Sequence, residues 1–131
     1  MKTQTILLVM IISMLTGCGE SVENPVEELV QWNIINVEGP TVGVLNQAVT
    51  FNVSCPTSSG CDYVSTFLSD DSNGKTILIK AYGGTTKNTM CTMAAMPIIV
   101  KYEFTPHEKG QYVLKFISKG ESVIEHDLTV N

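Results

Sequence analysis

The chain has 131 residues, and its 13 acidic residues outnumber eight lysines, with no arginine, so that the formal net charge is −5. Recognition of phosphate and carboxylate groups relies heavily on arginine, and nucleic-acid binding requires a basic surface. The composition therefore argues against nucleic acid and anionic ligands as partners, and the length fits one domain with a modest core.

Residues 1–17 have the organisation of a signal peptide. Lys2 gives a positive start, and residues 6–15 form an apolar run that is too short to span a bilayer. The Leu-Thr-Gly-Cys sequence at positions 15–18 resembles the lipobox of bacterial lipoproteins. The resemblance implies that the Cys18 thiol receives a diacylglyceryl group, that the chain is cut before Cys18, and that the new amine is acylated, with palmitate as the expected chain. The alternative is an ordinary secretory signal with an accidental cysteine.

Lipid on Cys18 would attach the chain to a membrane of the bacterial cell envelope. Burial of acyl chains contributes about 0.8 kcal/mol per CH₂, so two or three chains form an effectively permanent anchor. Gly19 follows the cysteine, whereas in the best-known lipoprotein sorting rule an aspartate there favours the inner membrane. The resemblance thus implies an outer-membrane location, facing the periplasm or the surface, with the bilayer as one partner.

Residues 18–33 are predicted to form a tether between the lipid and the domain. Its first part is polar and contains four glutamates (Glu20, Glu23, Glu27 and Glu28), which favour a solvated, extended chain. Residues 29–35 are the first apolar stretch after the signal, and we expect them to dock as an edge strand, with Trp32 stapling the tether to the domain. The domain itself is predicted to cover residues 34–131.

Apolar residues alternate with other residues in five short runs, which is the period of a β-strand. The runs are residues 49–53, 77–81, 98–104, 112–116 and 124–130. Sequences typical of turns bound them, at positions 39–40, 71–74, 83–84, 106–110 and 119–120. Helical spacing is limited to one possible turn at residues 90–96. The pattern predicts an all-β sandwich of about seven strands.

Two segments resemble immunoglobulin-like domains. Residues 102–114 are similar to the E strand, corner and F strand of that fold, and residues 38–51 are similar to the A and B strands of its bacterial members. The resemblance implies an immunoglobulin-like antiparallel β-sandwich over residues 34–131, with Tyr112 as the corner tyrosine whose hydroxyl bonds back to the backbone. This fold hosts many unrelated functions, so it does not indicate an activity.

Three cysteines, Cys55, Cys61 and Cys91, remain besides Cys18. An extracytoplasmic location permits disulfides, and an odd number leaves at least one thiol unpaired. A Cys61–Cys91 bridge would close a loop of about 30 residues, worth roughly 3–4 kcal/mol. A Cys55–Cys61 bridge would pin the turn between them, while a Cys55–Cys91 bridge and three reduced thiols are also compatible with the sequence. The spacing around Cys61 and Cys91 also resembles small uncharacterised immunoglobulin-like lipoproteins of Gram-negative envelopes, which implies the Cys61–Cys91 pair and makes Cys55 an addition.

Binding of a soft metal ion is the most specific alternative function for the region around Cys91. Met90, Cys91, Met93 and Met96 place three thioethers and a thiol within seven residues, and such ligands select Cu(I). A cupredoxin-type site needs a histidine soon after its cysteine, and the next histidine is His107. Methionine also fills gaps in hydrophobic cores, so the packing interpretation is preferred.

Enzyme motifs and calcium or zinc motifs are weak or absent in the sequence. It has no Gly-x-Ser-x-Gly or His-Glu-x-x-His motif. His107 is predicted in a turn, and His126 at an inward position bonded to the backbone. Residues 70–74 resemble part of a calcium loop but lack the later glutamate, which favours a hairpin turn.

These observations predict a lipid-anchored, non-enzymatic binding or interaction module without a cofactor. Its contact surface is expected at residues 83–96, a loop with two glycines and with methionines that we expect to be exposed. The expected partner is an envelope protein or glycan, in addition to the membrane. The alternative function is copper binding or redox chemistry through Cys91 and its neighbouring methionines.

Overall fold

The computed structural model describes residues 28–87, 90–93 and 95–131. These residues form nine strands: β1 (Val30–Gln31), β2 (Asn36–Glu38), β3 (Val42–Gly43), β4 (Val49–Cys55), β5 (Asp62–Asn73), β6 (Thr76–Thr85), β7 (Ile98–Phe104), β8 (Gly110–Ile117) and β9 (Val123–Val130). The predicted signal peptide, Cys18 and the tether up to residue 27 lie outside the described residues. Within the described ranges, no helix is long and apolar enough to cross a membrane.

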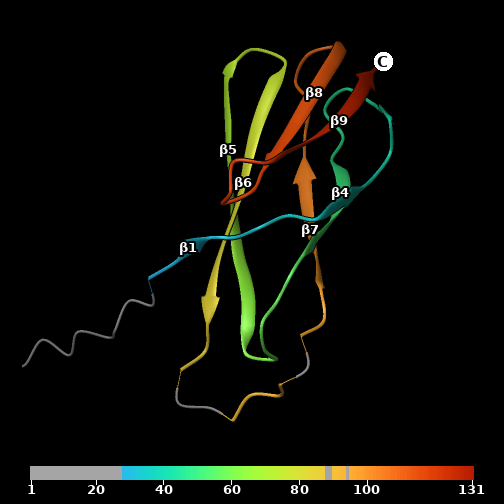
Figure 1. Ribbon diagram of the computed structural model, residues 1–131. Coiled ribbons are helices and arrows are strands. Elements are labelled where there is room, and N and C mark those ends of the chain that lie inside the picture. Colours follow the sequence, from blue (N-terminus) through green and yellow to red (C-terminus); the bar gives the residue numbers. More distant parts are fainter. Residues whose placement is uncertain (1–27, 88–89, 94) are drawn as a thin grey trace, which may run out of the picture.

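The strands form two sheets, which confirms the predicted all-β sandwich (Figure 1). In the larger sheet the hydrogen-bonded order is β1-β6-β8-β9-β3, and β5 also pairs with β6, outside this path. The smaller sheet has the order β2-β4-β7. The side chains predicted to point inward on β4, β6 and β8 are buried between the sheets. At the centre, the ring of Phe51 on β4 lies 6.1 Å from that of Phe116 on β8, and Tyr102 on β7 contacts both.

The neighbour of β8 differs from the predicted immunoglobulin-like, antiparallel arrangement. In an immunoglobulin domain, the F strand lies beside the C strand, the first strand after B. Here β8 pairs in parallel with β6, with Ile77 opposite Leu114, and β5 forms the edge of the sheet. A second parallel pair joins β3 to β9. The 12 residues of β5 are mostly exposed, so their sequence shows no clear alternation from which this edge strand could be predicted.

The turn predicted at Gly83-Gly84 is wrong, because β6 continues through both glycines to Thr85. Gly83 pairs with Val64 of β5, next to a register shift in that strand. A β-carbon at position 83 would overlap the backbone carbonyl of Tyr63. Gly83 therefore allows β5 and β6 to approach each other closely, and it does not form a turn.

Residues 30–38, called the strap below, cross from one sheet to the other (Figure 1). β1 pairs with β6, and the Trp32 amide donates to the Ala81 carbonyl at 2.8 Å. Further along, the Ile35 amide donates to the Ser54 carbonyl at 2.9 Å, after which β2 pairs with β4. The expected edge strand in residues 29–35 is thus β1, and the sandwich begins before the predicted boundary at Ile34.

The corner between β7 and β8 has the expected tyrosine. The Tyr112 hydroxyl donates a hydrogen bond to the Glu108 carbonyl at 2.9 Å, and its ring packs against Phe104 with centroids 5.3 Å apart. Gly110, with a φ of 125°, occupies a conformation that other residues rarely adopt. These contacts fix the path of the chain from the small sheet to the large one.

Candidate contact site at the disulfide end

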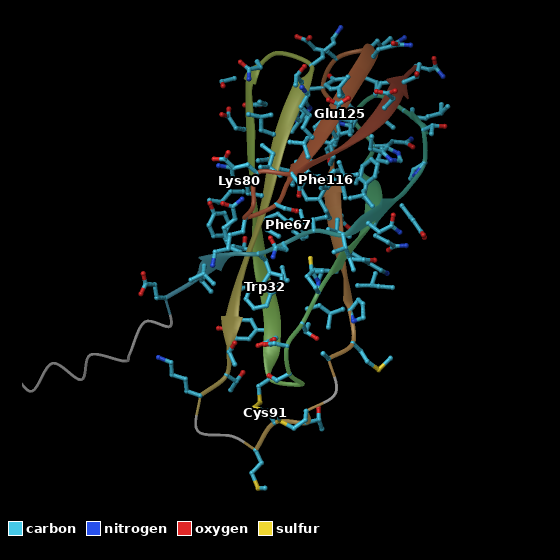
Figure 2. All side chains as sticks on the ribbon, in the orientation of Figure 1. Trp32, Phe67, Lys80, Cys91, Phe116 and Glu125 are labelled. Atoms are coloured by element: carbon cyan, nitrogen blue, oxygen red, sulfur yellow. A yellow bond between two sulfur atoms is a disulfide. The ribbon has the colours of Figure 1, made fainter. Side chains whose placement is uncertain are left out.

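A disulfide joins Cys61, just before β5, to Cys91 in the segment between β6 and β7, which confirms that predicted pairing. The two α-carbons are 5.3 Å apart. The Gly60 amide also donates to the Thr92 carbonyl at 2.9 Å. Figure 2 shows Cys91 at the end of the molecule opposite to the C-terminus marked in Figure 1. The bridge therefore holds residues 90–93 against the start of β5.

Cys55 is the third cysteine of the domain and carries a free thiol. It occupies the last inward position of β4 and is fully buried in the core. Burial raises the pKa of this thiol to about 11, since the thiolate would lack solvation. Cys55 thus acts as a small apolar core residue, and its thiol is not poised for redox or metal chemistry.

Asp62, the first residue of β5, organises the polar part of this end. Its carboxylate accepts hydrogen bonds from the Ser58 and Ser59 amides at 2.6 and 3.1 Å, from the Ser58 hydroxyl at 2.8 Å and from the Thr85 hydroxyl at 2.6 Å. The Thr85 bond is the main reason that the pKa of Asp62 falls to about 2, and the bonds from Ser58 and Ser59 add to it, while burial opposes it. A carboxylate held ionised by four donors is suited to fixing the loop and poorly suited to proton transfer near neutral pH.

Trp32, which belongs to the strap, lies on the side of the strap that faces the disulfide end (Figure 2). Its indole Nε1 donates to the Pro56 carbonyl at 2.8 Å, which ties the strap to the loop after β4. One open depression of about 330 Å³ lies between Trp32, Pro56, Asp62 and Lys119, among other residues. A second, of about 280 Å³, also borders Trp32 and extends to Glu28, Tyr63 and Lys87. The predicted stapling role of Trp32 matches these contacts.

The three methionines between β6 and β7 are directed to solvent. Met90 is fully exposed, and Met93 and Met96 are 91% and 70% exposed. The Thr57 hydroxyl donates to the Met96 carbonyl at 2.6 Å, so the backbone here is attached to the domain although the side chain is not buried. This exposure agrees with the contact surface expected at residues 83–96, whereas the core-packing interpretation that was weighed against copper binding is wrong.

The predicted copper-ligand set is also changed by the disulfide. The sulfur of Cys91 is bonded to Cys61, so it offers no thiolate to a metal ion, and Cys91 has to be removed from the set. Only the thioethers of Met90, Met93 and Met96 are left. Among the described residues, no three histidine, cysteine or acidic side chains come together as a metal-binding group.

The remaining candidates from the sequence lie outside the disulfide end. His107 Nδ1 is 3.2 Å from Asn46 Oδ1, and His126 Nε2 is 3.0 Å from the Pro40 carbonyl, with its ring against Phe51. Of the segment 70–74, residues 70–73 form the end of β5, and the hairpin turn to β6 lies at Gly74 and Lys75, where the Gly74 amide donates to the Asp71 carbonyl at 3.1 Å. Each of these polar groups makes contacts that stabilise a turn or a strand.

The site could be predicted only in part. The segment 83–96 is the expected contact surface, and most of its described residues are exposed from Thr85, the last residue of β6, onward. The role of Asp62 was missed, because its donors come from two loci separated in sequence, Ser58 and Ser59 on one side and Thr85 on the other. The only local signal was the pair of serines shortly before an aspartate, a common turn motif.

Comparison with known families gives one match. Residues 51–130 match the family model described as the ORF11 beta-sandwich domain, which spans β4 to β9. No curated protein and no solved structure matched the chain.

Proposed function

We propose that this chain, which belongs to the ORF11 beta-sandwich domain family, is a lipid-anchored binding module of the bacterial cell envelope, without catalytic activity. The lipid is attached to Cys18, and Gly19 favours the outer membrane. The sandwich is held outside the cytoplasm by this anchor and binds another envelope component through its disulfide end.

The Cys61–Cys91 disulfide is the observation that carries the proposal. Disulfides persist in oxidising compartments such as the periplasm and the cell surface, and they are rare in the cytosol. The bridge spans 30 residues of sequence. An export signal that ends in a lipobox supplies the route to such a compartment, so the two features support each other although they lie in different parts of the chain.

The form of the disulfide end supports binding rather than catalysis. Asp62 has four donors on its carboxylate, and Cys91 is committed to the bridge. Large apolar side chains at Met90 and Met93 are exposed on a segment that the bridge fixes. Exposed apolar groups on a fixed loop are typical of interaction surfaces.

The anchor is tested by mass spectrometry of the full chain purified from membranes, digested without reduction. We expect a Cys18 peptide that begins at the cysteine and carries a diacylglyceryl group, and a linked Cys61–Cys91 peptide with Cys55 free. The Cys18→Ser variant is the control, because it keeps the apolar signal but has no thiol for the lipid. An unmodified Cys18 in the wild-type protein would refute the lipid anchor.

Binding is tested with the same lipidated protein. Site-specific photo-crosslinkers at position 90 in intact cells should give a reproducible adduct, and the same probe at Val44, at the other end of the sandwich, should not. A hydrolase or redox activity that survives in the Met90→Ser variant but is lost with Asp62→Asn would instead indicate an enzyme.

A further inference from the structure

All methionines among the described residues lie on one short segment and face solvent. The chain has six methionines, of which three belong to the predicted signal peptide and three are Met90, Met93 and Met96. These three have the highest exposed fractions of the large apolar side chains in the described ranges. The core contains valine, isoleucine, leucine, phenylalanine, tyrosine, alanine and Cys55, and no methionine of the described segment. A chemical change at a methionine sulfur would therefore leave the packing between the sheets unaltered.

The other sulfur atoms of the domain are closed to a dissolved oxidant. Cys61 and Cys91 are bonded to each other in the disulfide. Cys55 is fully buried, and burial raises the pKa of its thiol to about 11, so the reactive thiolate is scarce near neutral pH. A thioether has no proton to lose before it reacts. Within the described residues, oxidation of sulfur is therefore directed to the three methionines.

The backbone that carries these methionines is attached to the domain at three places. The disulfide holds Cys91, the Gly60 amide donates to the Thr92 carbonyl at 2.9 Å, and the Thr57 hydroxyl donates to the Met96 carbonyl at 2.6 Å. None of these attachments uses a methionine side chain. Addition of an oxygen atom to the sulfur therefore breaks no bond that holds the segment, and we expect the oxidised domain to stay folded.

Oxidation of a thioether changes the character of the side chain. With hydrogen peroxide, the sulfur lone pair attacks one peroxide oxygen and the O–O bond breaks. The sulfur keeps that oxygen and loses two electrons, while the other oxygen takes up a proton and leaves as water. The product is a polar sulfoxide in place of an apolar thioether. A sulfoxide reductase that uses a dithiol reverses the step, since the dithiol becomes a disulfide and the oxygen leaves as water.

We propose that Met90, Met93 and Met96 form a reversible oxidation site, at which an oxidant of the peroxide class converts the disulfide end from an apolar to a polar surface while the sandwich stays folded. The inference goes beyond the proposed function, because the chemistry requires neither a lipid on Cys18 nor a bound partner. Its consequence for the domain is that the apolar character of the segment depends on the oxidant level in its compartment.

The site is tested with hydrogen peroxide on the purified full chain, with N-acetylmethionine amide in the same solution as the reference. Peptide mapping without reduction should show sulfoxide at all three methionines, a gain of about 48 Da for three oxygen atoms. Met90 and Met93 should react at a rate within about threefold of the reference, and Met96, which is less exposed, more slowly. The oxidised protein should elute earlier from a hydrophobic-interaction column and unfold at the same urea concentration as the untreated protein.

The matched control combines Met90→Leu, Met93→Leu and Met96→Leu, because leucine is apolar and similar in volume but has no thioether. Peroxide should leave the column retention of this variant unchanged. Met93→Leu alone is the second variant, should the triple variant lose the Cys61–Cys91 bridge; it should gain about 32 Da in this segment, for two oxygen atoms.

Three results would overturn the inference. Oxidation of Met90 and Met93 more than about tenfold slower than the reference would show that the segment shields them. A fall in the urea midpoint that follows sulfoxide formation would show that these side chains support the fold. Failure of a sulfoxide reductase with dithiothreitol to remove the added oxygen, under conditions in which it reduces the urea-unfolded oxidised chain, would show that the site is not reversible.

Discussion

The backbone carbonyl of Tyr63 fills the space in which a side chain at Gly83 would have to lie. β5 and β6 approach each other closely at this point, which lies next to the register shift of β5 between Val64 and Thr66. The strands stay paired through Tyr63 and Gly84, and the Thr85 hydroxyl then reaches Asp62. The missing side chain at Gly83 is thus a condition for the geometry of the disulfide end.

Gly83→Ala should lower the free energy of unfolding by about 1–3 kcal/mol, the usual cost of inserting a carbon into closely packed structure. Gly120→Ala is the control, since a β-carbon at Gly120 meets no atom within 4 Å, and its effect should be small. Urea unfolding of both variants measures the difference. Equal stability of the two variants would show that β5 can move away from β6 without cost.

Tyr112→Phe should lower the free energy of unfolding by about 1 kcal/mol, because it removes one partly buried hydrogen bond and leaves the ring in place. The lost bond is the one from the hydroxyl to the Glu108 carbonyl. Tyr82→Phe serves as the control, as no hydrogen bond of the Tyr82 hydroxyl is found in the described part of the chain. The experiment would contradict the corner assignment if both variants unfolded at the same urea concentration as the wild type.

Removal of the disulfide by the double change Cys61→Ala and Cys91→Ala should cost about 3–4 kcal/mol, from the entropy of an unfolded chain no longer closed over 30 residues. Dithiothreitol should destabilise the wild type by a similar amount and leave the double variant unchanged. Thermal unfolding with and without reductant checks both statements. Cys55→Ala keeps the bridge, so it must retain the response to dithiothreitol; if it does not, the pairing is different in solution.

Stability should decrease as the pH falls from about 4 to about 2, in part because of Asp62. The pKa of Asp62 falls from its ordinary value of 3.8 to about 2 in the folded protein. The main cause is the hydrogen bond from Thr85, and the bonds from Ser58 and Ser59 add to it. In this window the unfolded chain binds the proton and the folded chain does not, so protonation favours unfolding; the stabilisation is fully present above about pH 4.

The variants Asp62→Asn and Thr85→Val test this dependence. Asp62→Asn removes the titrating group, so the curve of unfolding free energy against pH should be flatter between pH 4 and pH 2. Thr85→Val removes the main donor, so the flattening should be partial. Unfolding measured at a series of pH values checks the order, and three parallel curves would rule out Asp62 as a contributor.

Alternation of apolar residues allowed the faces of the strands to be predicted but not their neighbours. The inward positions Phe51, Ile79 and Leu114 are fully buried, since one residue in two must face the core. The alternation of apolar residues does not indicate which strand lies beside β8. The parallel pairing of β8 with β6 therefore could not be predicted. Tyr112 was identifiable because its hydrogen bond lies within one corner, four residues back along the chain.

The candidate site shows the same division between local and distant contacts. Cys61 and Cys91 could be named as a possible pair, but the residues alone left three pairings open. Met93 has the same hydropathy whether it fills a core gap or faces solvent, and only the placement of the chain by the disulfide decides that it is exposed. Contacts between residues that are far apart in the sequence therefore could not be predicted from the pattern of residue types.

The parallel pair of β6 and β8 has a consequence for the order of assembly. β7 lies between these strands in the sequence but belongs to the other sheet, where it pairs with β4. The large sheet cannot be completed by adding hairpins one after another, because the chain must first lay β7 against β4 on the far side of the core. Both sheets are then expected to form in one slow, cooperative event dominated by distant pairings, and a chain that has emerged only as far as β7 lacks the partner of the Thr76–Lys80 part of β6, which pairs with β8.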